Sequence, residues 1–115
     1  MKTMSLLFAA IFFLSSTNVF AQGKSKTETV QIKTSAICGE CKERIEVALY
    51  ALKGVKSAKL DLATKAVTVK YKPASVSTEQ LHKAINAAGY DADEMPADQQ
   101  AYQKLPHCCQ KGGHD

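Results

Sequence analysis

The sequence predicts an α+β fold, a sandwich in which two helices cover one face of a four-stranded antiparallel sheet. Three observations lead to this prediction. Apolar and polar residues alternate in three segments, as is typical of half-buried strands. In two other segments the apolar residues recur at helical spacing. The segments follow the order strand, helix, strand, strand, helix, and a weaker sixth segment is expected to complete the sheet.

The first strand is predicted over residues 29–35, where Val30 and Ile32 share one face. The period then changes, and residues 41–52 repeat their apolar side chains at helical spacing with charged residues between them. Gly54 is expected to end this helix, because glycine commonly follows a helix C-terminus.

A β-hairpin is predicted next. Residues 55–62 and 67–72 alternate in the manner of strands, and residues 63–65 are expected to form the tight turn between them. Three side chains of the earlier strand are expected to face inward: Ala58, Leu60 and Leu62.

The second helix has the clearest start signal. Ser77 is followed three residues later by Gln80, which predicts a capping box, and Val76 and Leu81 are placed to form a hydrophobic staple. Gly89 is expected to close this helix.

Residues 90–95 are expected to form a short last strand, although three acidic residues make its pattern weak. The six elements then give a ferredoxin-like βαββαβ arrangement. Beyond it lies a tail, residues 96–115, in which residues 97–105 are long enough for a short helix.

The N-terminus predicts export. Lys2 precedes an apolar run at residues 6–14, and small residues stand at the first and third positions before a cut after Ala21, as in a cleavable signal peptide. The run is too short to span a membrane. We therefore expect residues 1–21 to be a signal peptide, residues 22–28 a flexible lead-in, and the product to be a soluble periplasmic or secreted monomer.

Composition argues against a nucleic-acid partner. The formal net charge is +4 and falls to +3 once Lys2 is removed, and acidic residues are interspersed with the basic ones. There is no tryptophan and no basic run to form a nucleic-acid surface. What remains after cleavage suffices for one small domain, residues 29–95.

The four cysteines form two pairs, and the first pair predicts a metal site. Cys38 and Cys41 flank the predicted start of the first helix, where unpaired backbone N–H groups favour thiolates. Two thiolates suit soft ions that accept few ligands, such as Cu(I) or Hg(II). Zn(II) fits less well, because it requires four ligands and only Glu40 is nearby.

Two alternatives remain open for this pair. Cys38 and Cys41 could act in a thiol–disulfide oxidoreductase, or form a disulfide in an interaction domain. We favour a non-enzymatic binding protein.

His82 is expected on the outward, solvated face of the second helix.

The chain resembles the heavy-metal-associated domain family, which includes copper chaperones, domains of metal-pumping ATPases and periplasmic mercury-binding proteins. The resemblance covers residues 29–95 and rests on three stretches: Thr34-Ser35-Ala36-Ile37-Cys38-Gly39-Glu40-Cys41, Gly54-Val55, and Ala87-Ala88-Gly89-Tyr90-Asp91.

The resemblance implies that Cys38 and Cys41 bind the ion and that Tyr90 lies near the metal loop. It also implies transfer, by ligand exchange, to the cysteines of a metal-transporting membrane protein or a metal-binding partner domain. The chain departs from the family at Ser35-Ala36, where Gly-Met is usual and the methionine packs beneath the loop.

The tail contains further candidate ligands outside that resemblance: His107, Cys108, Cys109 and His114. Tracts rich in cysteine and histidine often bind metal. The tail is long enough to reach the loop and supply a third ligand. A disulfide-forming tail is the alternative.

Overall fold

The structure, a computed structural model, describes residues 26–112. The predicted signal peptide and most of the lead-in lie outside these residues. The elements along the chain are β1 (Glu28–Lys33), α1 (Gly39–Tyr50), β2 (Val55–Asp61), β3 (Ala66–Tyr71), α2 (Thr78–Ala87), α3 (Gln99–Gln103) and the 3-10 turn η1 (His107–Cys109).

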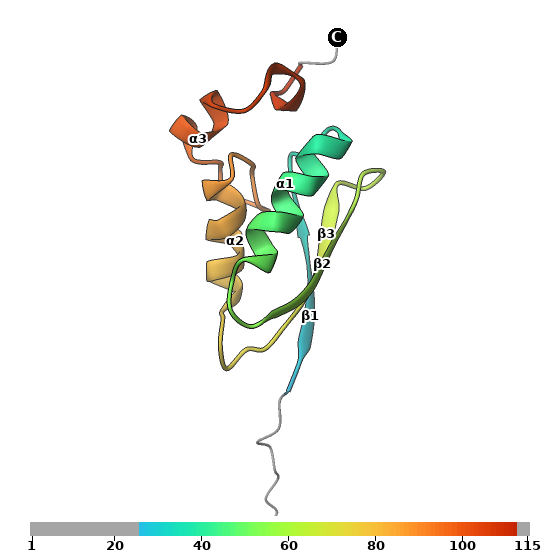
Figure 1. Ribbon diagram of the computed structural model, residues 1–115, viewed down its shortest axis with the longest axis vertical. Helices are drawn as coiled ribbons and strands as arrows, with labels where there is room; N and C mark the ends of the chain where they lie inside the picture. Colours follow the sequence, from blue (N-terminus) through green and yellow to red (C-terminus); the bar gives the residue numbers. More distant parts are fainter. Residues whose placement is uncertain (1–25, 113–115) are drawn as a thin grey trace, which may run out of the picture.

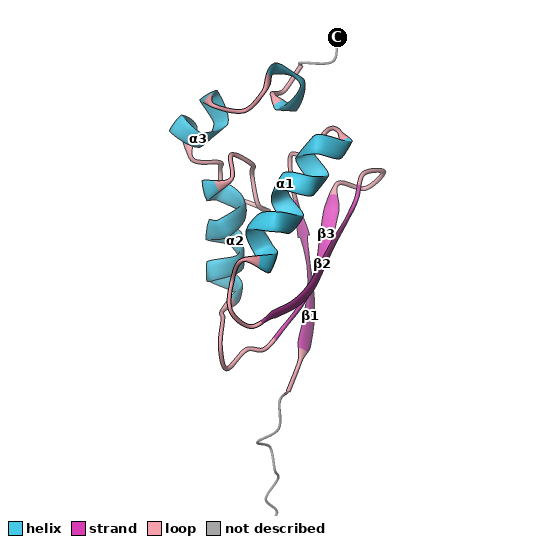
Figure 2. Cartoon of the chain, viewed as in Figure 1, coloured by secondary structure: helices cyan, strands magenta, loops and turns pink. Residues whose placement is uncertain are grey.

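The sheet has three antiparallel strands in the order β1-β3-β2, so β3 is central. Val69 lies opposite Val30 of β1 and opposite Ala58 of β2. Both long helices lie on the same side of the sheet (Figure 1, Figure 2). The predicted two-layer arrangement is therefore present, with one strand fewer in the described part of the chain.

The core lies between the sheet and the two helices. Alternation places one face of each strand inward, and helical spacing does the same for α1 and α2. The side chains with no exposed surface in these elements are Ile32, Cys41, Ile45, Leu49, Val67, Val69, Leu81 and Ile85. Burying a set of this kind stabilises the fold by about 1.5–3 kcal/mol for each large apolar side chain. The loop that precedes α1 is thus attached to a packed core.

The predicted fourth strand over residues 90–95 is wrong. Ala92 forms only isolated bridges, to Thr34 and to Met95. Asp93 has a positive φ of 51°, and its carboxylate accepts a hydrogen bond from the backbone N–H of Lys33 at 2.9 Å. The chain turns back at this point, so its pairing with the end of β1 does not continue beyond the contact between Asp93 and Lys33.

The same turn corrects the prediction for His82. Its side chain is only 16% exposed, because Nε2 lies 2.8 Å from the carboxylate of Asp93 and Nδ1 lies 2.7 Å from the carbonyl of Thr78. His82 therefore packs against the turn that replaces the fourth strand.

The remaining element boundaries differ by a few residues from the predictions. α1 begins at Gly39 and ends at Tyr50, four residues before Gly54. Leu62 lies in the hairpin turn and is 38% exposed, so its predicted inward position is wrong.

The predicted capping box at the start of α2 is confirmed. Ser77 Oγ accepts from the N–H of Gln80, and the Gln80 side chain accepts from the N–H of Ser77. Between residues 26 and 112, no helix has the length and apolar character needed to cross a membrane.

Candidate metal centre

The loop from β1 to α1 positions the first cysteine pair. Thr34 Oγ1 donates to the Lys65 carbonyl at 2.8 Å and accepts from the N–H of Ala36 at 3.2 Å. Ser35 Oγ accepts from the N–H of Asp91 at 2.9 Å. Ala36, at the position where the family usually has methionine, is completely buried. The loop is therefore fixed on both sides before it reaches Cys38.

Cys38 is the N-cap residue of α1, and Cys41 lies in its first turn. Cys38 has an extended backbone, and its carbonyl accepts the first helical hydrogen bond, from Lys42, at 3.0 Å. The two sulfurs are 3.3 Å apart. The positive end of the helix dipole and the unpaired N–H groups of the first turn favour negative charge on these sulfurs.

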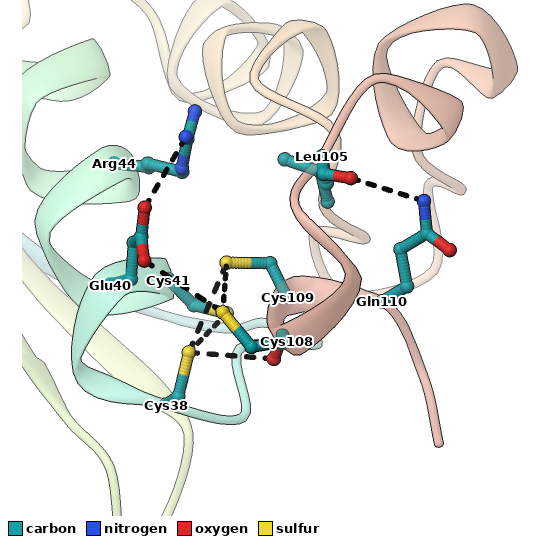
Figure 3. Close-up of polar contacts among 8 residues, drawn as sticks. All are labelled: Cys38, Glu40, Cys41, Arg44, Leu105, Cys108, Cys109 and Gln110. Atoms are coloured by element: carbon teal, nitrogen blue, oxygen red, sulfur yellow. Dashed lines mark hydrogen bonds and ion pairs between the residues drawn. The ribbon is translucent and has the colours of Figure 1, made fainter. Parts of the chain in front are cut away.

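The C-terminal tail brings the second cysteine pair to the same place. The sulfurs of Cys38, Cys108 and Cys109 lie within 4.8 Å of one another. Cys38 Sγ is 3.9 Å from Cys109 Sγ, and the two tail sulfurs are 4.0 Å apart. Figure 3 shows these side chains converging from the start of α1 and from η1. His107 is exposed and is not in this group, and His114 lies outside the described residues.

Cys41 and Cys109 form the buried side of the cluster, at 0% and 2% exposure. Burial raises the pKa of the Cys109 thiol to about 12, so this sulfur is protonated at neutral pH in the absence of an ion. A soft cation that binds this sulfur would displace the proton. The resulting thiolate would then neutralise one positive charge of the ion.

Tyr90 lies beside the cluster, as the resemblance implied. It is 1% exposed, and its hydroxyl has no well-formed hydrogen bond within residues 26–112. Burial raises the pKa of this hydroxyl strongly, and the adjacent Cys41 and Cys109 sulfurs raise it further. Tyr90 therefore contributes a neutral, mostly apolar wall to the site.

The outer side of the cluster is polar. The Cys108 thiol lies 3.7 Å from a Glu40 carboxylate oxygen, and the Cys108 carbonyl is 3.6 Å from Cys38 Sγ. Arg44 in turn lies 3.5 Å from the other oxygen of Glu40 (Figure 3). Cys38 and Cys108 are therefore the more exposed of the four cysteines.

Sequence reasoning missed what attaches the tail to the domain. Leu105 is 6% exposed and packs against Gly89, where an added Cβ would lie 3.1 Å from Leu105 Cγ. Gly89 was interpreted only as the end of a helix. Its positive φ of 105° was predictable, but the approach of Leu105 has no local sequence signal.

Fold and site together define a class of small α+β domain that presents clustered thiols at a helix N-terminus. Residues 32–91, a little more than half of the chain, match the heavy-metal-associated domain, and the chain belongs to this family. The matched region contains Cys38 and Cys41 but neither Cys108 nor Cys109.

Two curated relatives illustrate the range of proteins that contain this domain. The copper chaperone CopZ of Staphylococcus haemolyticus is 44% identical over 54 residues, which are 47% of this chain and 79% of that protein. A copper-exporting P-type ATPase of Staphylococcus epidermidis is 37% identical over 67 residues, which are 57% of this chain but only 8% of the ATPase.

Among solved structures, the chain is similar to oxidised MerP from Ralstonia metallidurans. The two share 26% sequence identity and superpose with a TM-score of 0.57. The match covers 59% of this chain and 96% of MerP.

Proposed function

We propose that this protein is an exported carrier that binds one soft metal ion, Cu(I) or Hg(II), through Cys38 and Cys41 and passes it on by thiolate exchange. The observation that carries this proposal is the pair of sulfurs 3.3 Å apart at the N-terminus of α1, inside the region that matches the family. Sulfur ligands of this kind select soft ions.

Copper is favoured by sequence, since relatives named as copper chaperones reach 44% identity. Mercury is supported by the structural similarity to MerP at lower identity. Both ions accept two or three sulfur ligands, so one site serves for either. Zn(II) would require two further ligands, from the tail or from Glu40.

We propose a location in the periplasm or outside the cell, and the predicted signal peptide, residues 1–21, supports this. The similarity to part of a copper-exporting ATPase supports a metal-transporting membrane protein as the partner. Ligand exchange needs no catalytic group, so we propose a binding protein and not an enzyme.

The test is a titration of the reduced chain, residues 22–115, with Cu(I) in competition with a chromophoric chelator. Loss of a direct ligand should cost more than the roughly 10- to 100-fold that loss of an outer-shell partner costs. Cys38→Ser and Cys41→Ser should each therefore weaken binding by more than about 100-fold. The Ser57→Ala change, at a half-buried position on β2 outside the metal centre, serves as the control.

Equal affinity in wild type and in the double variant would refute the proposal. Rapid thiol exchange with small disulfides, without tight metal binding, would instead support the oxidoreductase alternative. Repeating the titration with Hg(II) ranks the two ions.

A further inference from the structure

The tail is attached to the domain by specific contacts, and these place its cysteines over the metal loop. The N–H of Asp98 donates to the Asn86 carbonyl at 3.1 Å, and the N–H of Ala97 donates to Asp91 at 2.9 Å. Leu105 then fills the space left by the missing side chain of Gly89. The start and middle of the tail thus contact the end of α2 and the turn beyond it.

The end of the tail is folded back on α3. The Gln110 side-chain amide lies within hydrogen-bond distance of three backbone carbonyls, those of Tyr102, Gln103 and Leu105, at 3.2–3.4 Å. The N–H of Lys111 donates to the Tyr102 hydroxyl at 2.8 Å, and its ammonium group lies 3.0 Å from Asp91. These contacts close the loop around η1 and fix where its two cysteines lie.

The spacings from the Cys38 sulfur to those of Cys41 and Cys109 suit one ion with three sulfur ligands. With metal–sulfur bonds of about 2.3 Å, two sulfurs on opposite sides of an ion are about 4.6 Å apart, and three in a plane are about 4 Å apart. Cys38 and Cys109 are already 3.9 Å apart. The distance between the Cys38 and Cys41 sulfurs, now 3.3 Å, would have to increase less for planar three-sulfur coordination than for linear two-sulfur coordination.

Burial distinguishes the two tail cysteines. Cys109 is 2% exposed and lies beside Cys41 and Tyr90, on the inner side of the cluster. Cys108 is only partly buried, and its thiol is directed toward the Glu40 carboxylate. An ion held at the loop would therefore have the Cys109 sulfur on its buried side, whereas Cys108 lies on the more exposed side.

We propose that Cys109 is a third sulfur ligand to the ion held by Cys38 and Cys41, and that residues 97–111 of the tail form an intramolecular cap that slows release of that ion. This inference rests on the proposed function, and it assigns a role to a segment outside the family match. A partner that takes the ion must first displace the Cys109 sulfur from it. The cap therefore favours retention over rapid transfer.

The adjacent cysteines provide a matched test, with Cys109→Ala as the variant and Cys108→Ala as the control. X-ray absorption on the Cu(I)-loaded chain, in buffer without added thiols, should give three sulfur neighbours in wild type and in Cys108→Ala, and two in Cys109→Ala. Transfer of the ion to a chelator should be roughly 10- to 100-fold faster for Cys109→Ala and unchanged for Cys108→Ala. This factor is the one by which loss of an outer-shell partner typically weakens a metal site. The sulfur count should not depend on protein concentration, which excludes a ligand from a second copy.

Thermal unfolding of both variants without metal checks that each is folded, and Cys109→Ser provides a second substitution at the same position. Two sulfur neighbours in wild type, with equal release rates in all variants, would overturn the cap while leaving the proposed function intact. Failure of the wild type to bind Cu(I) would overturn both. Three neighbours that persist in Cys109→Ala but fall to two in Cys108→Ala would assign the ligand to Cys108 and contradict the assignment made here.

Discussion

The two cysteine pairs reach the same point by different structural means. Cys38 and Cys41 belong to a loop and helix whose buried residues are part of the core between the sheet and the two helices. Cys108 and Cys109 belong to a short tail in which, up to residue 112, only Leu105 and Cys109 are buried. Few buried contacts imply a low free energy of local opening. We therefore expect the tail to open more readily than the loop that holds Cys38 and Cys41.

The largest effect should come from the core that supports the loop. Leu49 is completely buried in α1, so Leu49→Ala should lower the free energy of unfolding by about 2–5 kcal/mol. Val47 in the same helix is 61% exposed, and Val47→Ala should change the free energy of unfolding by no more than about 0.5 kcal/mol. Chemical denaturation of the reduced apo-protein measures both. Equal effects would mean that α1 does not support the loop as described.

A smaller effect, confined to the tail, is expected at Gly89. Gly89→Ala places a side chain at a φ of 105° and against Leu105, which should cost about 1–3 kcal/mol. Amide hydrogen exchange should become faster at Leu105 and Cys109 while the amides of β3 stay protected. Gly112 has a φ of 79° with open space around it, so Gly112→Ala separates backbone strain from the clash with Leu105. Uniformly faster exchange across the sheet would contradict a separable cap.

The smallest effect should be the response of the tail to acid. Burial tends to raise the pKa of Asp91, but the N–H of Ala97 and the Lys111 ammonium outweigh it and hold this pKa below its ordinary value. The stabilisation from Asp91 is therefore complete above its unfolded-state pKa and is lost as pH falls through the folded-state pKa. Because the Lys111 ion pair is largely exposed, it should contribute less than about 1 kcal/mol.

Asp91→Asn should remove this part of the acid response and leave the response of Asp93 unchanged. Burial tends to raise the pKa of Asp93 as well, but His82 and the N–H of Lys33 outweigh it and lower this pKa. The measurement is hydrogen exchange at Leu105 as a function of pH, corrected for intrinsic rates. An identical acid response in wild type and Asp91→Asn would show that Asp91 does not anchor the tail.

Most of the fold could be predicted from the sequence, because local patterns specify it. Alternation identified the three strands, and the Ser77–Gln80 capping box identified the start of α2. The predicted fourth strand failed at Asp93, whose positive φ and hydrogen bond to Lys33 are tertiary features. Short acidic segments have no core pattern that would distinguish a strand from a turn.

The candidate site was predictable to a similar extent. The spacing of Cys38 and Cys41 at a predicted helix start was sufficient to nominate them. The sequence also allowed the tail to reach the loop, but its length alone did not rank Cys108, Cys109 and His107. That ranking depends on the packing of Leu105 against Gly89, which joins residues far apart in the sequence.

The most direct test of the account is the alkylation rate of each cysteine, measured by mass spectrometry on the reduced chain with and without one equivalent of Cu(I). Sulfurs that bind the ion lose their nucleophilic lone pair to it, so Cys38, Cys41 and Cys109 should all react more slowly once the ion is bound, with Cys108 little changed. The account is contradicted if Cys38 and Cys41 react at the same rate in the metal-loaded and metal-free protein.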